Sequence, residues 1–249
     1  MLKPAMKIVS ESWHLSTKNW RNLLPYLTIL FLPALALAVL GIASLYLSMY
    51  FPQTSVVTNL LITMMSAAGF VLNIWASIAV TKALANFIMG QPINWKENFT
   101  SSSNLIWPIT FSSILFGLIV FGGSLLLIIP GIIFWGWYNL FTYPIIFEGA
   151  RGMSALRSSK ALIAGRWWSM VWRVFFPAVA FGFLNIIIIL VLILLIKALP
   201  LSPFGEMTAT TLLSSLVGTL TTPLFTGAGL ILYQNAKQTP VAPEKTPTL

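Results

Sequence analysis

Residues 174–196 read VFFPAVAFGFLNIIIILVLILLI and contain no Lys, Arg, Asp or Glu. A helix needs about 20 apolar residues to cross the hydrocarbon core of a bilayer, so this stretch alone predicts one membrane span. Three more uncharged stretches cover residues 22–81, 98–147 and 207–236. The first two are each long enough for a helical hairpin and the third for a single span. The sequence therefore predicts an all-α integral membrane protein with six transmembrane helices.

The predicted spans form, together with the N-terminal segment, one domain over residues 1–236; they cover residues 22–49, 56–86, 106–129, 132–147, 172–198 and 209–234. Pro130 and Gly131 fall between the third and fourth spans, where proline fixes φ and glycine tolerates positive φ. We expect a tight turn there. The fourth span would rise only about 24 Å, so either the bilayer thins or Pro144 marks a kink. Residues 237–249 are rich in Pro, Thr and charge and predict a disordered cytoplasmic tail.

The composition of the whole chain agrees with a membrane protein. Of 249 residues, 57% are hydrophobic and 8% are charged, and mean hydropathy is +0.88, whereas soluble domains are about 25% charged. The absence of Cys excludes a disulfide scaffold. The chain has no Asp, five Glu and one His, which disfavours an enzyme and predicts no metal or cofactor.

The position of the positive charges predicts the topology. Thirteen of the 14 Lys and Arg residues lie in the N-terminal segment, in the connections after the second and fourth spans, and in the tail. Only Lys197 lies on the other side. The positive-inside rule then places both termini in the cytoplasm. The net charge of +9 is accordingly a topological signal, and we expect no nucleic-acid partner.

Amphipathic segments precede three of the spans. In residues 5–21 a charged face lies opposite a face with Trp13 and Trp20, which is typical of a helix in the headgroup layer. Similar spacing recurs over residues 95–106 and 163–174. The chain thus predicts three interfacial cytoplasmic helices, each followed by a helical hairpin. This pattern has two explanations: three parallel hairpin repeats, or three unrelated hairpins that each follow an amphipathic helix. Residue identities barely match between the units, so both explanations stay open.

Four basic residues form a Trp-rich cytoplasmic collar that could bind anionic lipid headgroups: Arg157, Lys160, Arg166 and Arg173. Glu148 precedes them at the membrane boundary, where a carboxylate is costly unless it is paired. Arg151 follows at i+3, which favours an ion pair at this elbow; Lys160 or Arg157 could also pair with Glu148 if the amphipathic helix folds back. The alternative for Glu148 is a proton or ligand site.

Asn73, Asn139 and Asn185 fall near the middle of three predicted spans. Such amides form hydrogen bonds between helices, or they could converge into a polar cluster that coordinates a solute. Small residues at four-residue spacing in the third and last spans favour close helix packing. These faces serve either the interior or self-association and contact with a protein partner.

The elbow region resembles a known family. The motif runs from Ile129-Pro130-Gly131 through Tyr143-Pro144 and Glu148-Gly149 to Ala155-Leu156 and Ser158-Ser159-Lys160. It is similar to that of YciC-like six-span bacterial inner-membrane proteins and of the membrane domain joined to some glycerophosphodiester phosphodiesterases. The resemblance implies a multi-pass protein of the bacterial cytoplasmic membrane. It implies no catalytic residue here, because the phosphodiesterase activity belongs to a separate domain.

The sequence therefore favours a non-enzymatic multi-pass membrane protein that engages membrane lipids or a membrane partner through its basic, Trp-rich collar. The rival hypothesis is a permease or exporter of a small or amphiphilic solute, with the three Asn side chains along its path. A membrane-embedded lipid enzyme that uses Glu148 as its acid is the weakest reading.

Overall fold

The structure, a computed structural model, describes residues 2–51 and 55–240. Every regular element in these ranges is a helix, which confirms the all-α prediction. Five helices are long and apolar enough to cross a bilayer and indicate a membrane protein; they are α2 (Trp20–Tyr50), α3 (Ser55–Met89), α5 (Ile106–Leu126), α9 (Trp167–Lys197) and α10 (Pro203–Gln238). All five coincide, to within a few residues, with predicted spans.

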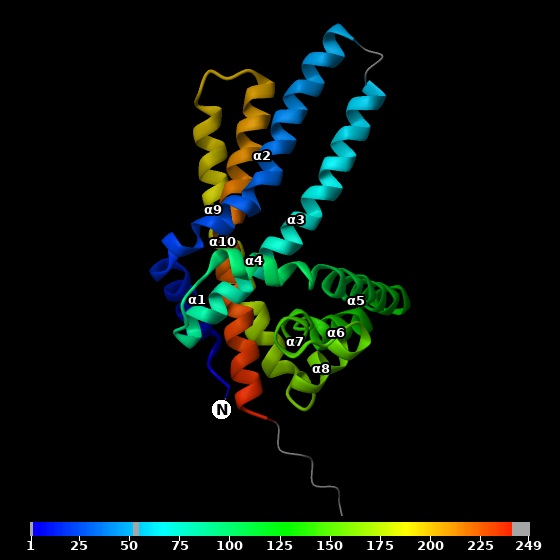
Figure 1. Cartoon of the computed structure of the whole chain (residues 1–249), viewed down its shortest axis with the longest axis vertical. Coiled ribbons are helices and arrows are strands. Elements are labelled where there is room, and N and C mark those ends of the chain that lie inside the picture. The colour runs from blue at the N-terminus through cyan, green and yellow to red at the C-terminus, as the bar shows by residue number, and fades with distance from the viewer. Residues whose placement is uncertain (1, 52–54, 241–249) are drawn as a thin grey trace, which may run out of the picture.

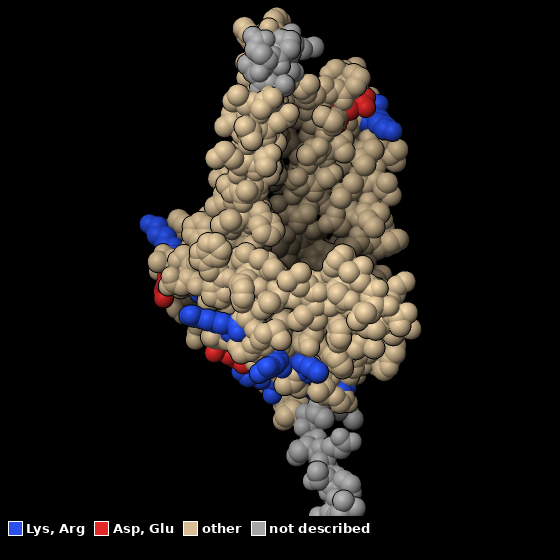
Figure 2. All heavy atoms as spheres, turned by 90° about the vertical axis from the view of Figure 1, so that its right-hand side faces the viewer, with Lys and Arg blue, Asp and Glu red and all other residues tan. Residues whose placement is uncertain are grey.

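The long helices form two hairpins that point the same way. Helix α2 packs on α3 and α9 packs on α10, and α10 also contacts α2 and α3. Figure 1 shows α5 extending sideways from the foot of α3, with α6, α7 and α8 below it. Lys and Arg side chains gather on the lower part of the molecule in Figure 2, apart from one basic side chain that lies beside an acidic one near a hairpin tip. We call this lower part, where α1, α8 and the last turns of α10 lie, the basic end.

The tightly packed core lies near the basic end. Its fully buried members include Ile8 of α1, Tyr26 of α2, Leu84 of α3 and Leu232 of α10. The outer halves of α2, α3 and α9 instead expose Leu, Ile, Val and Met side chains. Figure 2 shows a hollow between the two long hairpins above this core. Apolar surface of this kind suits contact with lipid.

Three short amphipathic helices lie at the feet of the long ones: α1 (Ala5–Lys18), α4 (Trp95–Ser103) and α8 (Met153–Ile163). Helix α1 ends three residues before the predicted end of the 5–21 segment. It buries Ile8, Ser12 and Ser16, while the Trp-bearing face stays about half exposed. The segment predicted over 163–174 is not a separate helix. Gly165 has a φ of +75°, which ends the preceding structure, and α9 begins at Trp167.

The predicted span over 132–147 is wrong as a single helix. The structure has α6 (Ile128–Tyr138) and α7 (Thr142–Glu148), separated by three turn residues at 139–141. Pro144 has no N–H and disfavours continuous helix before it. It lies instead in the first turn of α7, where a missing N–H costs little. The break therefore precedes the proline by several residues.

The turn predicted at Pro130 and Gly131 is also displaced. The chain reverses at Leu127, which is extended (φ −164°, ψ 148°), and both residues lie in the first turns of α6. Proline suits the first turn of a helix. Gly131 allows α5 and α6 to approach closely, since a Cβ there would lie 2.0 Å from Ser124 Oγ.

The predicted tail begins later than expected. Helix α10 continues through Lys237 to Gln238. The remainder of the predicted tail, residues 241–249, lies outside the described residues.

Candidate functional site

A cavity of about 310 Å³ lies between the α6–α7 break, α9 and α10. Its polar lining residues are Asn139, Thr142, Tyr143 and Arg173. Its apolar lining comes mainly from Trp135, Leu140, Val174, Pro177, Ala178, Phe225, Ala228 and Leu232. We call it the Asn139–Arg173 cavity. It combines a few polar groups with apolar walls, which is the usual composition of a small-molecule site.

Asn139 reaches the cavity because α6 ends there. It is the C-cap residue of α6, and its N–H donates to the carbonyl oxygen of Trp135 at 3.1 Å. Its side-chain Oδ1 is buried without a hydrogen-bond partner among the described residues. A buried amide oxygen left in this state costs about 1–3 kcal/mol. This oxygen is covered by protein atoms, so the contribution of Asn139 to the cavity is as a lining residue.

Arg173 brings a positive charge to the cavity from the second turn of α9. Its Nε donates to the carbonyl oxygen of Lys3 at 2.6 Å, and its Nη1 donates to the carbonyl oxygen and hydroxyl of Ser169. Nη2 has no partner within the described ranges. The ion pairs found there are Lys3–Glu11 and Lys237–Glu148, so no carboxylate neutralises Arg173.

Tyr143 forms the wall between this cavity and a second pocket of about 300 Å³ lined by α3, α5, α7 and α10. Its hydroxyl donates to the carbonyl oxygen of Thr226 at 3.3 Å, and its ring stacks on Tyr233 with centroids 5.2 Å apart. The close approach depends on Gly229, because a Cβ there would lie 2.1 Å from the Tyr143 hydroxyl.

The four predicted collar residues divide into two pairs. Arg157 and Lys160 on α8 are exposed, and Lys160 Nζ lies 4.3 Å from the centre of the Trp137 ring. Arg166 instead donates to the carbonyl oxygens of Leu162, Ala236 and Thr239. Arg166 thus binds the end of α10, and Arg173 binds the segment that precedes α1. Arg166 is committed to this anchoring role, and Arg173 keeps one free NH₂ group.

The predicted ion pair between Glu148 and Arg151 is wrong. Helix α7 ends at Gly149 in the left-handed conformation (φ +69°), so Arg151 does not follow on the same helical face. Glu148 instead pairs with Lys237 at 2.9 Å and accepts a hydrogen bond from the Tyr233 hydroxyl. Burial raises the pKa of the Glu148 carboxyl. The Tyr233 hydroxyl and the Lys237 ammonium together lower this pKa by a larger amount, so the net shift is downward.

The three predicted intramembrane amides do not form one cluster. Asn73 donates to the carbonyl oxygen of Gly69 in its own helix and lines the second pocket. Asn185 donates to Thr221 Oγ1 at 2.9 Å and so links α9 to α10. Only Asn139 lines the cavity with Arg173. Two of the three amides thus donate to acceptors away from the cavity, Asn73 within its own helix and Asn185 to α10.

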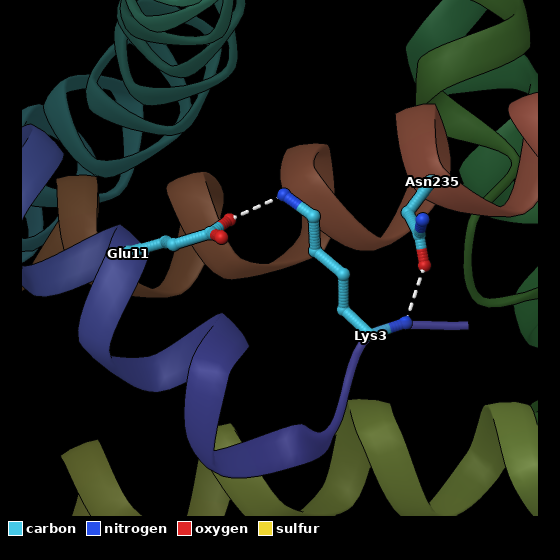
Figure 3. A network of polar contacts seen from close by, with 3 residues as sticks. All are labelled: Lys3, Glu11 and Asn235. Atoms are coloured by element: carbon cyan, nitrogen blue, oxygen red, sulfur yellow. Dashed lines mark hydrogen bonds and ion pairs between the residues drawn. The ribbon is translucent and has the colours of Figure 1, made fainter. Parts of the chain in front are cut away.

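A polar pocket of about 410 Å³ at the basic end was not predicted. Figure 3 shows its central contacts: Lys3 Nζ lies 2.7 Å from Glu11 Oε2, and the Lys3 N–H donates to Asn235 Oδ1 at 2.7 Å. His14 and Lys18 also line it. The charged stripe of residues 5–21 was the sequence signal for this pocket, but nothing in it indicated Asn235, which is 232 residues away.

Comparisons of the chain with protein-family models, with curated proteins and with solved structures give no match. The resemblance to YciC-like proteins therefore stays a prediction from the elbow motif. The function has to be argued from the geometry of the cavity.

Proposed function

We propose that this protein binds an anionic membrane amphiphile, with the head group in the Asn139–Arg173 cavity. The observation that carries the proposal is the state of Arg173, a partly buried cation that lines a cavity and has no carboxylate partner within the described ranges. A partly buried charge at a membrane boundary needs polar partners; the carbonyl oxygens of Lys3 and Ser169 supply two of them, and an anion could supply a further one at Nη2. One free Nη2 group suits a single phosphate or carboxylate oxygen.

The other lining residues narrow the chemistry of the ligand. Thr142 and Asn139 are polar residues in the cavity lining near the break between α6 and α7, which suits a polar head group at that end of the cavity. The remaining walls are mainly apolar and suit the first part of a hydrocarbon chain. At about 310 Å³ the cavity is at the small end of ligand sites, so it fits a head group rather than a whole lipid.

This proposal changes the place of the lipid contact predicted from the sequence. The collar is an outer surface of four equivalent cations in that prediction, whereas the structure leaves only Arg157 and Lys160 with exposed side chains. Those two remain suited to weak, non-specific attraction to anionic headgroups, about 1 kcal/mol each. Arg173 differs from them because it is partly buried and lines a cavity, which favours one specific ligand.

Native mass spectrometry of the protein released from vesicles of phosphatidylglycerol and phosphatidylcholine tests the proposal. Ala178→Phe adds a bulky side chain to the lining of the cavity without changing a charge, and Arg173→Gln removes the cation. The matched controls are Val179→Phe, on the neighbouring exposed position of α9, and Arg157→Gln on α8. We expect both cavity variants to lower retention of phosphatidylglycerol at least tenfold and both controls to retain it.

Unchanged retention in Ala178→Phe would refute the proposal, even if Arg173→Gln lost lipid, because the contact would then lie outside the cavity. Equal retention of the two lipids by the unaltered protein would refute the anionic specificity.

The alternative is a permease or exporter of a small or amphiphilic solute. It draws support from the two pockets that meet at Tyr143, one lined by Asn73 and the other by Asn139. Solute uptake into proteoliposomes that is abolished by Tyr143→Trp, with lipid retention unchanged, would favour this alternative.

A further inference from the structure

We infer that α5 and α6 form a hairpin that enters the bilayer at the basic end and does not cross it, so that only α2, α3, α9 and α10 span the membrane. The partner of its exposed tip is the hydrocarbon of the adjacent leaflet. This inference is independent of the amphiphile proposal, because it concerns a different surface.

The lengths of the two helices argue against a crossing. Helix α5 has 21 residues and would rise about 31 Å, enough for the hydrocarbon core of about 30 Å. Helix α6 has only 11 residues and would return about 16 Å. The chain is nevertheless back at the basic end by α8, which packs against both helices. An upright α5 would leave the chain near the far side of the bilayer, and no single helix before α8 is long enough to return it, because a turn at residues 139–141 separates α6 from α7.

The contacts with α8 place the foot of the hairpin at the basic end. The Gly152 N–H donates to Ser112 Oγ of α5 at 3.0 Å, and Ser159 Oγ donates to the Trp137 carbonyl oxygen of α6 at 2.8 Å. The ammonium of Lys160 lies over the Trp137 ring. A cation on a Trp ring is typical of the interfacial layer of a membrane. Figure 1 shows the hairpin extending sideways from this level rather than along the long hairpins.

The tip itself has the character of a hydrocarbon-facing surface. Its five consecutive residues, Leu125, Leu126, Leu127, Ile128 and Ile129, are each 68–79% exposed. Residues 98–147 contain no Lys, Arg, Asp or Glu. Contact between water and an exposed apolar run of this kind is unfavourable, and such a run marks a surface for a partner or a membrane. No helix within residues 2–51 and 55–240 covers it.

The backbone at the tip is adapted to a medium without water. Only Leu127 leaves the helical conformation, and its N–H donates to the Gly123 carbonyl oxygen. The first N–H groups of α6 have no partner within that helix, and Pro130, in its first turn, carries no N–H at all. The proline thus removes one donor that lipid could not satisfy.

Single-cysteine labelling tests the inference, and the chain offers a clean background because it contains no Cys. The test position is Leu127→Cys, with Leu126→Cys as a second variant. Ala164→Cys next to α8 reports the basic side and Leu201→Cys in the α9–α10 connection reports the far side; both positions are exposed. A membrane-impermeant maleimide is added to sealed vesicles of either orientation.

We expect each control to react from its own side only. The tip cysteines should react from neither side, at less than a tenth of the control level, and fully after denaturation in detergent. Reaction of the tip from the Leu201 side would show that the hairpin crosses, and reaction from the Ala164 side would show that it lies in water. Either result overturns the inference.

A nitroxide attached at the same tip position then measures depth from its relative exposure to oxygen and to a polar nickel complex. The reference is Ile187→Cys, an exposed position near the middle of the apolar part of α9. We expect the depth of the tip, measured from the basic side of the bilayer, to be smaller than the depth of residue 187. A tip as deep as residue 187, or deeper, would overturn the inference.

Discussion

The fit between Tyr143 and Gly229 gives the sharpest test of the cavity wall. A methyl group at position 229 would lie 2.1 Å from the Tyr143 hydroxyl, 3.0 Å from Cζ and 3.4 Å from Cε2. Overpacking of this kind costs about 1–3 kcal/mol, whereas Gly→Ala inside a helix gains up to about 1 kcal/mol. We therefore expect Gly229→Ala to lower the free energy of unfolding by about 1–2 kcal/mol.

Removal of the hydroxyl should reverse most of this effect. Tyr143→Phe alone loses one long hydrogen bond, worth about 0.5–1 kcal/mol, and leaves Cζ as the nearest atom to the new methyl group. In the double variant the Gly229→Ala change should cost about 0.5 kcal/mol or less, a coupling of about 0.5–2 kcal/mol.

Unfolding in sodium dodecyl sulphate, followed by Trp fluorescence, measures these differences. Gly218→Ala on the same helix is the matched control, because no atom lies within 4 Å of its added Cβ; this variant should be neutral or stabilised. A coupling near zero, or a Gly229→Ala variant as stable as the control, would refute the described packing of α7 on α10.

Three further predictions concern the basic end. Tyr26→Phe should lower the free energy of unfolding by about 1–3 kcal/mol, because the buried Asn98 Nδ2 loses its 2.8 Å hydrogen bond; an equal loss in Tyr26→Phe and in a double variant with Asn98→Ala would confirm that one bond is responsible. Ser12→Ala should lower the melting temperature through loss of about 1 kcal/mol, since its hydroxyl donates to the Leu224 carbonyl oxygen at 2.6 Å; a melting temperature equal to that of the unaltered protein would contradict this contact. The folded-state pKa of Glu148 is lowered from its ordinary value of 4.5, so its contribution to stability is complete above that pH and is lost as pH falls through the lowered pKa. Thermal unfolding between pH 3 and 6 should show this loss in the unaltered protein and not in Glu148→Gln.

Charge-free runs in the sequence were sufficient to locate the long helices. Five long helices lie where the sequence predicts spans, because a run of about 20 apolar residues is itself enough to specify a membrane helix. The break at residues 139–141 was missed, since the 132–147 segment is as apolar as its neighbours. Pro144 correctly predicted an interruption of this helix. The interruption precedes Pro144 by several residues, because proline is favoured in the first turn of a helix.

The partners of the polar residues could not be predicted in the same way. Local spacing suggested Arg151 for Glu148, whereas the observed partner, Lys237, comes from the last helix. Arg166 and Arg173 resembled free surface cations because their acceptors are backbone carbonyl oxygens, which leave no mark in a sequence pattern. The cavity depends on three segments that meet only in the tertiary structure. Of its polar residues, Asn139 and Arg173 were predicted as site residues, and Tyr143 was named only as part of the elbow motif.

The hydrogen bonds of the N-terminal segment have a consequence for biosynthesis. Lys3 and Ser12 bind Arg173, Leu224 and Asn235, which follow them in the chain by 170, 212 and 232 residues. The ribosome must therefore reach residue 235 before α1 can take its final place. Until then α1 must wait outside the bundle, and the emergence of α10 completes its binding site.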